Sequence, residues 1–472
     1  MSQTPEIAFL TAVEAREAFQ SKRLSPVELT EAVLERIDQH NQRFNAYCLV
    51  DAESAIAQAR ASEERWNRGE PLGALDGVPT AIKDLILTRG WPTLRGSLAI
   101  NPNQDWRDDA PIVERLRQSG AVLLGKTTTP ELGWKGVTDS PLTGITRNPW
   151  DESRTAGGSS GGSAAAVVLG MATLAVGTDG GGSIRIPAGF CGCTGLKPTF
   201  GRVPVWPVSP FGSLSHAGPM TRTVADTALM MDVIARPHAR DWTALPDDGV
   251  NYSQALTGGV KGLRIAYIPN FISPQFGSVQ VDPEVAAAVR RAAKVFEDLG
   301  AHVEEMNAPF DDLLDLFTLF WHAGAAQVLS SYEPEARAKM DPGLQEIAAE
   351  GSSYSLMPYL EATTQRGNLG VKLSQFHERF DLLLTPTLPL PAFEAGHEVP
   401  QGWSGRRWQT WTPFSYPFNL TQQPAISVPC GLTASGLPIG LQLVGAKYRD
   451  ALVLRAAHAY ETSSPMPRKS PV

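Results

Sequence analysis

The feature of this sequence that most constrains its fold is an alternation of short apolar segments with helix-like segments, which begins near residue 73. The early apolar segments are rich in β-branched residues and are separated by glycine and proline, as strands commonly are. Later ones are apolar throughout, which is typical of strands buried on both faces of a sheet. We therefore expect strands at residues 77–82, 121–124, 174–177, 263–268, 382–385, 425–428 and 439–443. This alternation predicts an α/β fold, in which helices cover a central sheet.

The N-terminal region, residues 1–65, has a different pattern, which predicts helices. Its clearest start signal is an N-cap at Ser25, a proline at the first helical position, Pro26, and a capping-box glutamate, Glu28. Apolar residues then recur on one face of the helix that follows.

The chain has 472 residues, of which 42% are hydrophobic, so it can bury a sizeable core. A polar stretch near residues 241–262 resembles a linker, yet strand-like segments continue on both sides of it without a shift in composition. One large domain over residues 1–472 is therefore expected. Within it, the variable region 309–417 and its C-terminal flank carry an aromatic patch beside glycine and proline, which we interpret as an irregular segment that lines a substrate pocket. The aromatic residues of this patch are Phe393, Trp403, Trp408, Trp411, Phe414, Tyr416 and Phe418.

Charge and composition exclude several classes of protein. The net charge is −8, and no run of basic residues is longer than a pair. Nucleic acid is therefore not expected as a direct ligand, because a phosphate backbone would find no basic stripe. The chain starts without the pattern of a signal peptide, and no apolar stretch approaches the roughly 18 residues of a membrane span. We expect a cytoplasmic protein without a membrane anchor.

The cysteines do not indicate a disulfide scaffold or a metal site. There are 4 of them, and none has the paired spacing of a zinc ligand set. We interpret Cys48, Cys191, Cys193 and Cys430 as reduced, buried thiols.

Two short motifs suggest chemistry that their surroundings do not favour. Residues 120–127 match the phosphate-binding pattern GxxxxGK[ST], but the four middle residues are Ala-Val-Leu-Leu, which predicts a buried strand rather than a phosphate-binding loop. Residues 158–162 match the GxSxG pattern at Ser160, but the residues before them are polar and not strand-like. Of the histidines, only His216 lies in a promising loop for a serine–histidine hydrolase.

Two glycine-serine segments form a stronger candidate. They cover residues 157–163 and 178–187, and they flank one helix-like stretch and one strand. Consecutive glycines let backbone N–H groups converge on one point, as the anionic oxygen of an acyl-transfer intermediate requires. The glycines of this candidate oxyanion hole are Gly180, Gly181 and Gly182. The serine that follows could attack a carbonyl once a base removes its proton.

These segments resemble those of the amidase signature family. The spacing from Ser159 to Ser183 matches the family, and similarity extends over nearly the whole chain. The other similar segments are residues 77–84, 125–127, 191–199, 218–219, 381–387 and 436–442. The resemblance implies a single large amidase-signature domain with a mixed central sheet covered on both faces by helices.

The resemblance also implies roles for individual residues. Family members hydrolyse or transfer acyl groups with a Ser-Ser-Lys triad, so Ser183 corresponds to the nucleophile, Ser159 to a bridging serine in a cis peptide bond, and Lys83 to the base. A lysine accepts a proton near neutral pH only if its pKa falls from about 10.4, so we expect Lys83 to be buried. Attack by Ser183 would give an oxyanion held by the N–H groups of residues 180–183. The leaving amine would take a proton through Ser159, and water would then hydrolyse the acyl-enzyme.

Further residues match family positions in supporting roles. Asp179 and Arg185 are expected to hold the glycine loop, and Ser160 to shape the pocket. The resemblance places Cys191 and Cys193 in a structural turn rather than in catalysis. It implies no metal and no organic cofactor.

The family covers several substrate classes, from amidases and carbamate-cleaving enzymes to the glutaminase subunit of tRNA-dependent amidotransferases. That subunit usually carries Asp-Gln before Ile-Gly-Pro, where this chain has Ser215, His216 and Ala217 before Gly218 and Pro219. The difference favours an autonomous amidase, and the alternative is a glutaminase-type subunit that acts only in a complex. The aromatic patch favours a small apolar or aryl amide, anilide or carbamate, since rings stack on rings and exclude water. Homodimers are common in the family, and the resemblance is compatible with one here.

Overall fold

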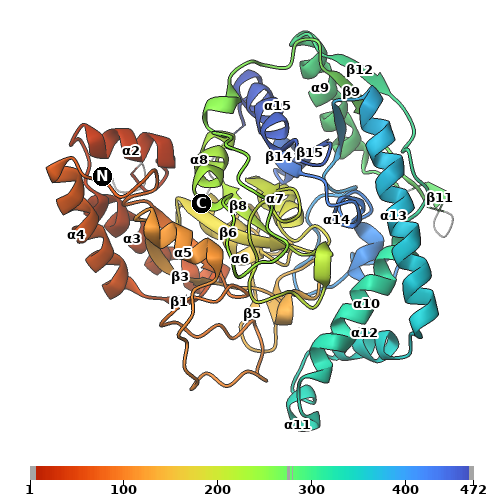
Figure 1. Ribbon diagram of the computed structural model, residues 1–472, viewed down its shortest axis with the longest axis horizontal. Helices are drawn as coiled ribbons and strands as arrows, with labels where there is room; N and C mark the ends of the chain where they lie inside the picture. The colour runs from red at the N-terminus through yellow and green to blue at the C-terminus, as the bar shows by residue number, and fades with distance from the viewer. Residues whose placement is uncertain (1–6, 274–276, 279, 467–472) are drawn as a thin grey trace.

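The computed structural model describes residues 7–273, 277–278 and 280–466, and an 11-stranded sheet runs through its centre (Figure 1). The strand order is β1 (Tyr47–Val50), β3 (Val122–Thr127), β2 (Pro79–Lys83), β6 (Leu174–Asp179), β8 (His216–Thr221), β7 (Thr194–Lys197), β14 (Ala425–Leu432), β15 (Pro438–Gly445), β13 (Leu382–Pro386), β9 (Arg264–Tyr267) and β12 (His302–Glu305). Strands β3, β2 and β6 are parallel, as are β13, β9 and β12, whereas the strands between these two sets pair antiparallel. The sheet is therefore mixed, as the family resemblance implied.

Every strand expected from the apolar segments is present, with ends shifted by a few residues. Strand β13 shows why these segments read as buried on both faces. Leu382 and Leu384 pack into the hydrophobic core on one side of the sheet, and Leu383 packs into the core on the other. Alternate residues of a strand point to opposite faces, so a strand covered on both sides is apolar throughout.

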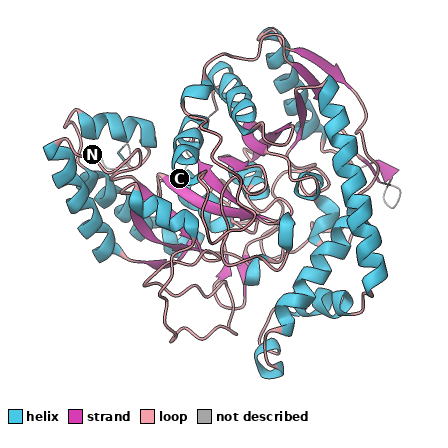
Figure 2. Cartoon of the chain, in the orientation of Figure 1, coloured by secondary structure: helices cyan, strands magenta, loops and turns pink. Residues whose placement is uncertain are grey.

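Helices cover both faces of the sheet (Figure 2). One face carries α5 (Pro111–Gln118), α8 (Val224–Ile234), α9 (Pro283–Asp298) and α15 (Asp450–Ser463). The other face carries α2 (Ala12–Gln20), α3 (Pro26–Phe44), α4 (Ala52–Arg68), α6 (Gly161–Val168), α7 (Arg185–Cys191), α10 (Leu314–Ser330), α12 (Pro342–Ser352), α13 (Leu356–Arg379) and α14 (Pro417–Leu420). This arrangement confirms the predicted α/β class.

The short elements lie in the connections. They are α11 (Pro334–Arg337), the 3₁₀ helices η1 (Glu131–Gly133), η2 (Gly212–Leu214), η3 (Gln254–Leu256) and η4 (Trp408–Trp411), and two small hairpins, β4 (Asp139–Ser140) with β5 (Gly144–Ile145) and β10 (Ile272–Ser273) with β11 (Gly277–Ser278). Of the helices described, none is both long and apolar enough to cross a lipid bilayer.

The N-terminal region is helical except for one strand. Helix α3 begins with the expected capping box, in which Ser25 and Glu28 each accept a hydrogen bond from the other's backbone N–H. The prediction of an entirely helical region 1–65 is wrong at β1, which pairs antiparallel with β3 at the sheet edge. Its first residue, Tyr47, is anchored by a hydrogen bond from its hydroxyl to the Met171 carbonyl. Residues 1–6 of the predicted region lie outside the described residues.

Region 309–417 contains far more regular structure than expected. Helices α10, α11, α12 and α13 occupy most of residues 314–379, so the prediction of an irregular segment is wrong there. Apolar residues of α10, α12 and α13 share one hydrophobic core with β13 and β9, and this packing stabilises the helices.

Candidate active site

The sheet brings the two glycine-serine segments to the end of β2. Strands β2 and β6 are parallel and paired through Ile82 and Val176, so their carboxyl ends, Lys83 and Asp179, meet at the same edge of the sheet. The second glycine-serine segment continues directly from β6. The first leads into α6, whose N-cap is Ser160, and α6 packs on β6 and β2. Ligands commonly bind at the carboxyl ends of parallel strands.

Lys83 is fully buried, and its amine is surrounded by hydroxyl groups. Its Nζ lies 2.7 Å from Ser159 Oγ, 2.8 Å from Ser160 Oγ and 2.9 Å from Thr178 Oγ1. Burial lowers the pKa of Lys83 well below its ordinary value, and the negative charge of Asp179 only partly opposes this effect. The amine is therefore held in surroundings that favour its neutral form.

Ser159 and Ser183 both line a pocket beside this amine. The Gly158–Ser159 peptide bond is cis, as the resemblance implied. Ser183 is positioned through its backbone, because its carbonyl accepts a hydrogen bond of 3.0 Å from the N–H of Ser160. Its hydroxyl has no hydrogen-bond partner in the described part of the chain, and Ser183 keeps 3% of its surface exposed. The hydroxyl is thus available to a molecule in the pocket.

The carboxylate of Asp179 organises the glycine loop between β6 and α7. It accepts hydrogen bonds from the N–H groups of Gly182 (2.8 Å) and Ile184 (3.2 Å). The prediction that Gly182 donates to an oxyanion is therefore wrong, since its N–H is already used. The N–H groups of Gly180, Gly181 and Ser183 have no partner within the described residues. These three are the free donors of the loop.

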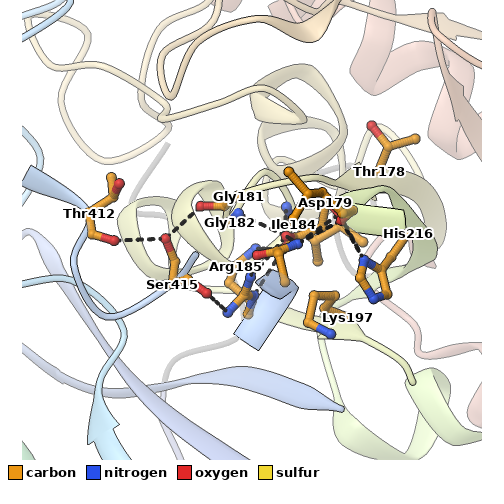
Figure 3. Close-up of polar contacts among 12 residues, drawn as sticks. Thr178, Asp179, Gly181, Gly182, Ile184, Arg185, Lys197, His216, Thr412 and Ser415 are labelled. Carbon is orange, nitrogen blue, oxygen red and sulfur yellow. Dashed lines mark hydrogen bonds and ion pairs between the residues drawn. The ribbon is translucent and has the colours of Figure 1, made fainter. Parts of the chain in front are cut away.

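A buried ion pair holds that carboxylate in place (Figure 3). Arg185 contacts both oxygens of Asp179, at 2.9 Å each. Burial alone would raise the pKa of Asp179, but the charge and hydrogen bonds of Arg185 dominate and lower it well below its ordinary range. Arg185 also donates to the Ser415 carbonyl and the Gln442 side chain, so the loop is tied to two later segments of the chain.

Sequence reasoning missed three polar residues of this site. Ser415 donates from Oγ to the Gly181 carbonyl at 2.6 Å, and Asn419 donates to the Asp179 carboxylate at 2.9 Å. Both come from segments more than 200 residues later, and no local pattern marks them. Thr178 is different, because it begins the second glycine-serine segment directly after an apolar strand, and that position could have identified it.

The pocket has an empty volume of about 980 Å³, part of which is open to solvent. Beside the serines, most of its wall is apolar, and its aromatic residues are Trp206, Phe211 and Trp321. Phe211 and Trp321 stack with their ring centroids 4.1 Å apart. Trp206 and Phe211 belong to the proline-rich loop at residues 204–215, which forms much of one wall.

The expectation that the aromatic patch around residues 393–418 lines this pocket is wrong. None of its seven rings is among the pocket residues, and they lie in or against the hydrophobic core under α10 and α13. Trp408 packs behind the glycine loop, where a Cβ on Gly181 would come within 2.8 Å of the Trp408 ring and 2.6 Å of Phe317. Composition alone does not distinguish rings in a core from rings in a pocket.

The other sequence candidates lie in structural positions. Lys126 of the phosphate-loop pattern is buried in β3, and its Nζ donates to the Ile86 carbonyl at 2.6 Å. His216 is buried at the start of β8, and its Nδ1 contacts the Leu214 carbonyl at 2.8 Å rather than a serine. Cys191 and Cys193 are buried free thiols, and burial raises the pKa of both. Cys430 is also buried.

Cys48 departs from the expectation of buried thiols, because the structure places it at an exposed position.

Comparison with known proteins agrees with this geometry. Residues 28–454 match the family model described as Amidase. An acylamidase of Rhodococcus erythropolis is 39% identical over 98% of this chain and 97% of its own length, and a subunit of the glutamyl-tRNA(Gln) amidotransferase of Chloroflexus aggregans is 37% identical over 97% and 96%. The crystal structure of a bacterial aryl acylamidase of the amidase signature family superposes with a TM-score of 0.88 at 32% identity, and the match covers 97% of this chain and 96% of that one. The chain therefore belongs to the amidase signature family and is a hydrolase that acts on amide C–N bonds.

Proposed function

We propose that this amidase hydrolyses small apolar or aryl amides, anilides or carbamates through an acyl-enzyme on Ser183. In this proposal Ser159 relays protons and Lys83 is the base. The observation that carries it is the 2.7 Å contact between the buried amine of Lys83 and the Ser159 hydroxyl, beside the free hydroxyl of Ser183. A serine hydroxyl is a weak nucleophile until a neighbouring base takes its proton.

The hydroxyl groups around Lys83 support a neutral amine as that base. A neutral amine has two N–H bonds and one lone pair. The Ser160 hydroxyl donates to the Thr178 carbonyl at 3.1 Å, so Ser160 is left to accept a hydrogen bond from Lys83. Ser159 has no such commitment, and its proton can therefore point to the lone pair of Lys83. This polarity allows a proton to pass from Ser183 through Ser159 to Lys83.

The reaction then follows the geometry of the glycine loop. The Ser183 oxygen attacks the substrate carbonyl, and the N–H groups of Gly180, Gly181 and Ser183 stabilise the oxyanion that forms. When the intermediate collapses, the C–N bond breaks and the leaving amine takes the proton back through Ser159. Water then attacks the acyl-enzyme with the same relay acting in reverse. Asp179 and Arg185 hold the loop in this arrangement, and Ser160 orients Lys83.

The pocket supports an apolar or aryl substrate. The rings of Trp206, Phe211 and Trp321 offer faces and edges against which a substrate ring can pack. The similarity to an acylamidase and to an aryl acylamidase structure points to the same substrate class.

The test is release of amine by the purified chain from three substrates: an aliphatic amide, a 4-nitroanilide and an aryl carbamate. Ser183→Ala serves as the blank, and Ser353→Ala, on an exposed hydroxyl at the end of α12, as the matched control. We expect release from the anilide and the carbamate to exceed that from the aliphatic amide, and to vanish only in Ser183→Ala. Turnover that survives in Ser183→Ala would overturn the proposal.

A glutaminase-type subunit is the second candidate, because subunits of two glutamyl-tRNA(Gln) amidotransferases are 37% identical over nearly the whole chain. Such a subunit would release ammonia from glutamine and depend on partner proteins. Absence of turnover with all three substrates, together with glutamine hydrolysis that appears only when partner subunits are added, would favour it.

A further inference from the structure

One charged side chain lines the pocket that contains Ser183. Of the residues described along its wall, Arg95 alone carries a formal charge, and the rest are apolar or neutral. Arg95 is half-buried and adopts a left-handed backbone conformation, with φ of 56°. An arginine in such a wall costs desolvation unless something pairs with it.

The backbone places Arg95 close to the serines. Its carbonyl accepts a hydrogen bond of 2.8 Å from the N–H of Leu132. The next residue, Gly133, lies against the bridging serine, since a Cβ at this position would be 3.4 Å from Ser159 Oγ. Arg95 and the reacting centre therefore belong to one continuous wall.

The guanidinium of Arg95 has no carboxylate partner in the described part of the chain. Two buried carboxylates in the same region are engaged elsewhere. That of Asp84 lies 3.5 Å from Lys126 and accepts backbone N–H groups of Arg95 and Gly96. That of Glu131 accepts hydrogen bonds of 2.5 Å from the Ser97 hydroxyl and from the Asp341 N–H. The guanidinium is thus free to bind an anion that enters the pocket.

We infer that Arg95 binds a carboxylate carried by the substrate, so that the preferred substrates are amides with both an apolar or aryl body and a carboxylate group. Arginine presents a planar set of N–H donors that matches a carboxylate in two parallel hydrogen bonds. The apolar wall strengthens that interaction because it excludes water. The inference rests on the proposed function, as it assigns the substrate class of the same site.

The test compares substrates that differ in charge but little in shape. 4-Acetamidobenzoate and 4-nitroacetanilide place a carboxylate or a neutral nitro group on the amine side of the amide bond. N-Phenylsuccinamate and valeranilide make the same comparison on the acyl side. Each is assayed with the wild type, Arg95→Met and Arg95→Lys. The matched control is Arg89→Met, which removes an exposed arginine whose partner, Asp109, lies outside the pocket.

We expect Arg95→Met to lower kcat/KM for at least one carboxylate substrate by about tenfold or more, because a hydrogen bond to a charged group is lost. Its neutral counterpart should change less than about threefold, Arg95→Lys should recover part of the loss, and Arg89→Met should change neither. Equal loss on charged and neutral substrates, or no loss on either, would overturn the inference.

A binding measurement separates this inference from the proposed function. Calorimetric titration of Ser183→Ala with 4-acetamidobenzoate and with N-phenylsuccinamate needs no turnover, and it is repeated with Arg95→Met added. Binding that depends on Arg95 supports the anion site even if the wild type hydrolyses none of the anilides, in which case only the proposed function fails. Binding of neither ligand, or binding indifferent to Arg95, contradicts the inference.

Discussion

A lysine amine that is withdrawn from water and surrounded by hydroxyl groups behaves as a base rather than as a cation. Lys83 is in this situation, with three hydroxyl oxygens within 2.9 Å of Nζ. Its neighbour in sequence, Asp84, has its carboxylate near Lys126 instead. The local charges therefore leave Lys83 without an ion-pair partner among the described residues.

The pH dependence of activity follows from the lowered pKa of Lys83. Protonated Lys83 cannot accept the serine proton, so kcat/KM for an anilide should fall as the pH drops below that pKa and level off above it. The limb should lie well below about 10.4, the pKa of an unperturbed lysine. Steady-state assays across pH, with Lys339→Met as the surface control, measure it. A limb near 10.4, or a profile without one, would speak against Lys83 as the base.

Removing the amine should abolish most of the activity. Lys83→Met keeps a long, unbranched side chain but has no proton acceptor, so kcat/KM should fall by about 10³-fold, within the range of general base catalysis. The same anilide assay measures this, and circular dichroism checks the fold. A correctly folded Lys83→Met with more than a tenth of wild-type activity would contradict the assignment.

Single residues show where sequence reasoning succeeds and fails. Lys83, Ser159 and Ser183 could be named because they stand in motifs that resemble a family, although they meet only through the folded sheet. Arg95 carries no local pattern, and its importance arises from the segments packed around it. Gly182 was taken for an oxyanion donor because the direction of a backbone N–H depends on the path of the loop, which composition does not reveal.

At the scale of elements, the loop from β6 to α7 owes its shape to groups from three parts of the chain. Asp179 and Arg185 belong to the loop and its helix, Ser415 and Asn419 come from the segment leading through α14, and Gln442 comes from β15. Each contact fixes either a carbonyl or an N–H of the loop, directly or through the ion pair. The free N–H groups are thus held in position before a substrate binds.

Breaking the buried ion pair should destabilise the protein. Asp179→Asn leaves the charge of Arg185 buried without a counter-charge, which typically costs about 3–5 kcal/mol in the free energy of unfolding. Urea denaturation measures the loss. Asp298→Asn, which removes an exposed partner of Lys294, is the control and should show no measurable change. Equal stability of Asp179→Asn and the wild type would mean that the ion pair does not hold the loop.

Loss of the Ser415 hydroxyl should affect catalysis more than binding. Ser415→Ala frees the Gly181 carbonyl from its 2.6 Å hydrogen bond, so the adjoining N–H groups become less well oriented toward the oxyanion. We expect kcat for an anilide to fall by about tenfold with KM little changed, less than the loss from deleting a direct donor. A change confined to KM would instead indicate a role in substrate binding.

Elements were predictable where their signals are local. The capping box of α3 and the apolar runs of the central strands require only neighbouring residues, and the structure contains both. Strand β1 was missed because four residues between two helices become a strand only by pairing with the edge of β3. Helix α10 was missed because its aromatic residues were read as pocket lining, whereas most pack against other helices.

At the scale of the whole molecule, the mixed sheet explains why residues far apart in sequence act together. Parallel pairing places the ends of β2 and β6 at one edge, and antiparallel pairing of β8, β7, β14 and β15 brings the C-terminal segments onto the glycine loop. The α/β class was predictable from the alternation of segments, but this strand order was not, because sheet pairing is set by contacts between distant residues. The candidate site is a product of that order.

The central claim is that Ser183 carries the acyl group. The most direct measurement is intact-mass spectrometry of the wild type quenched in acid during turnover of an aryl carbamate, followed by peptide mapping. The account predicts an added carbamoyl mass on the peptide that contains Ser183, and its absence in Ser183→Ala and in Lys83→Met. An adduct on another residue, or turnover with no adduct on Ser183, would contradict it.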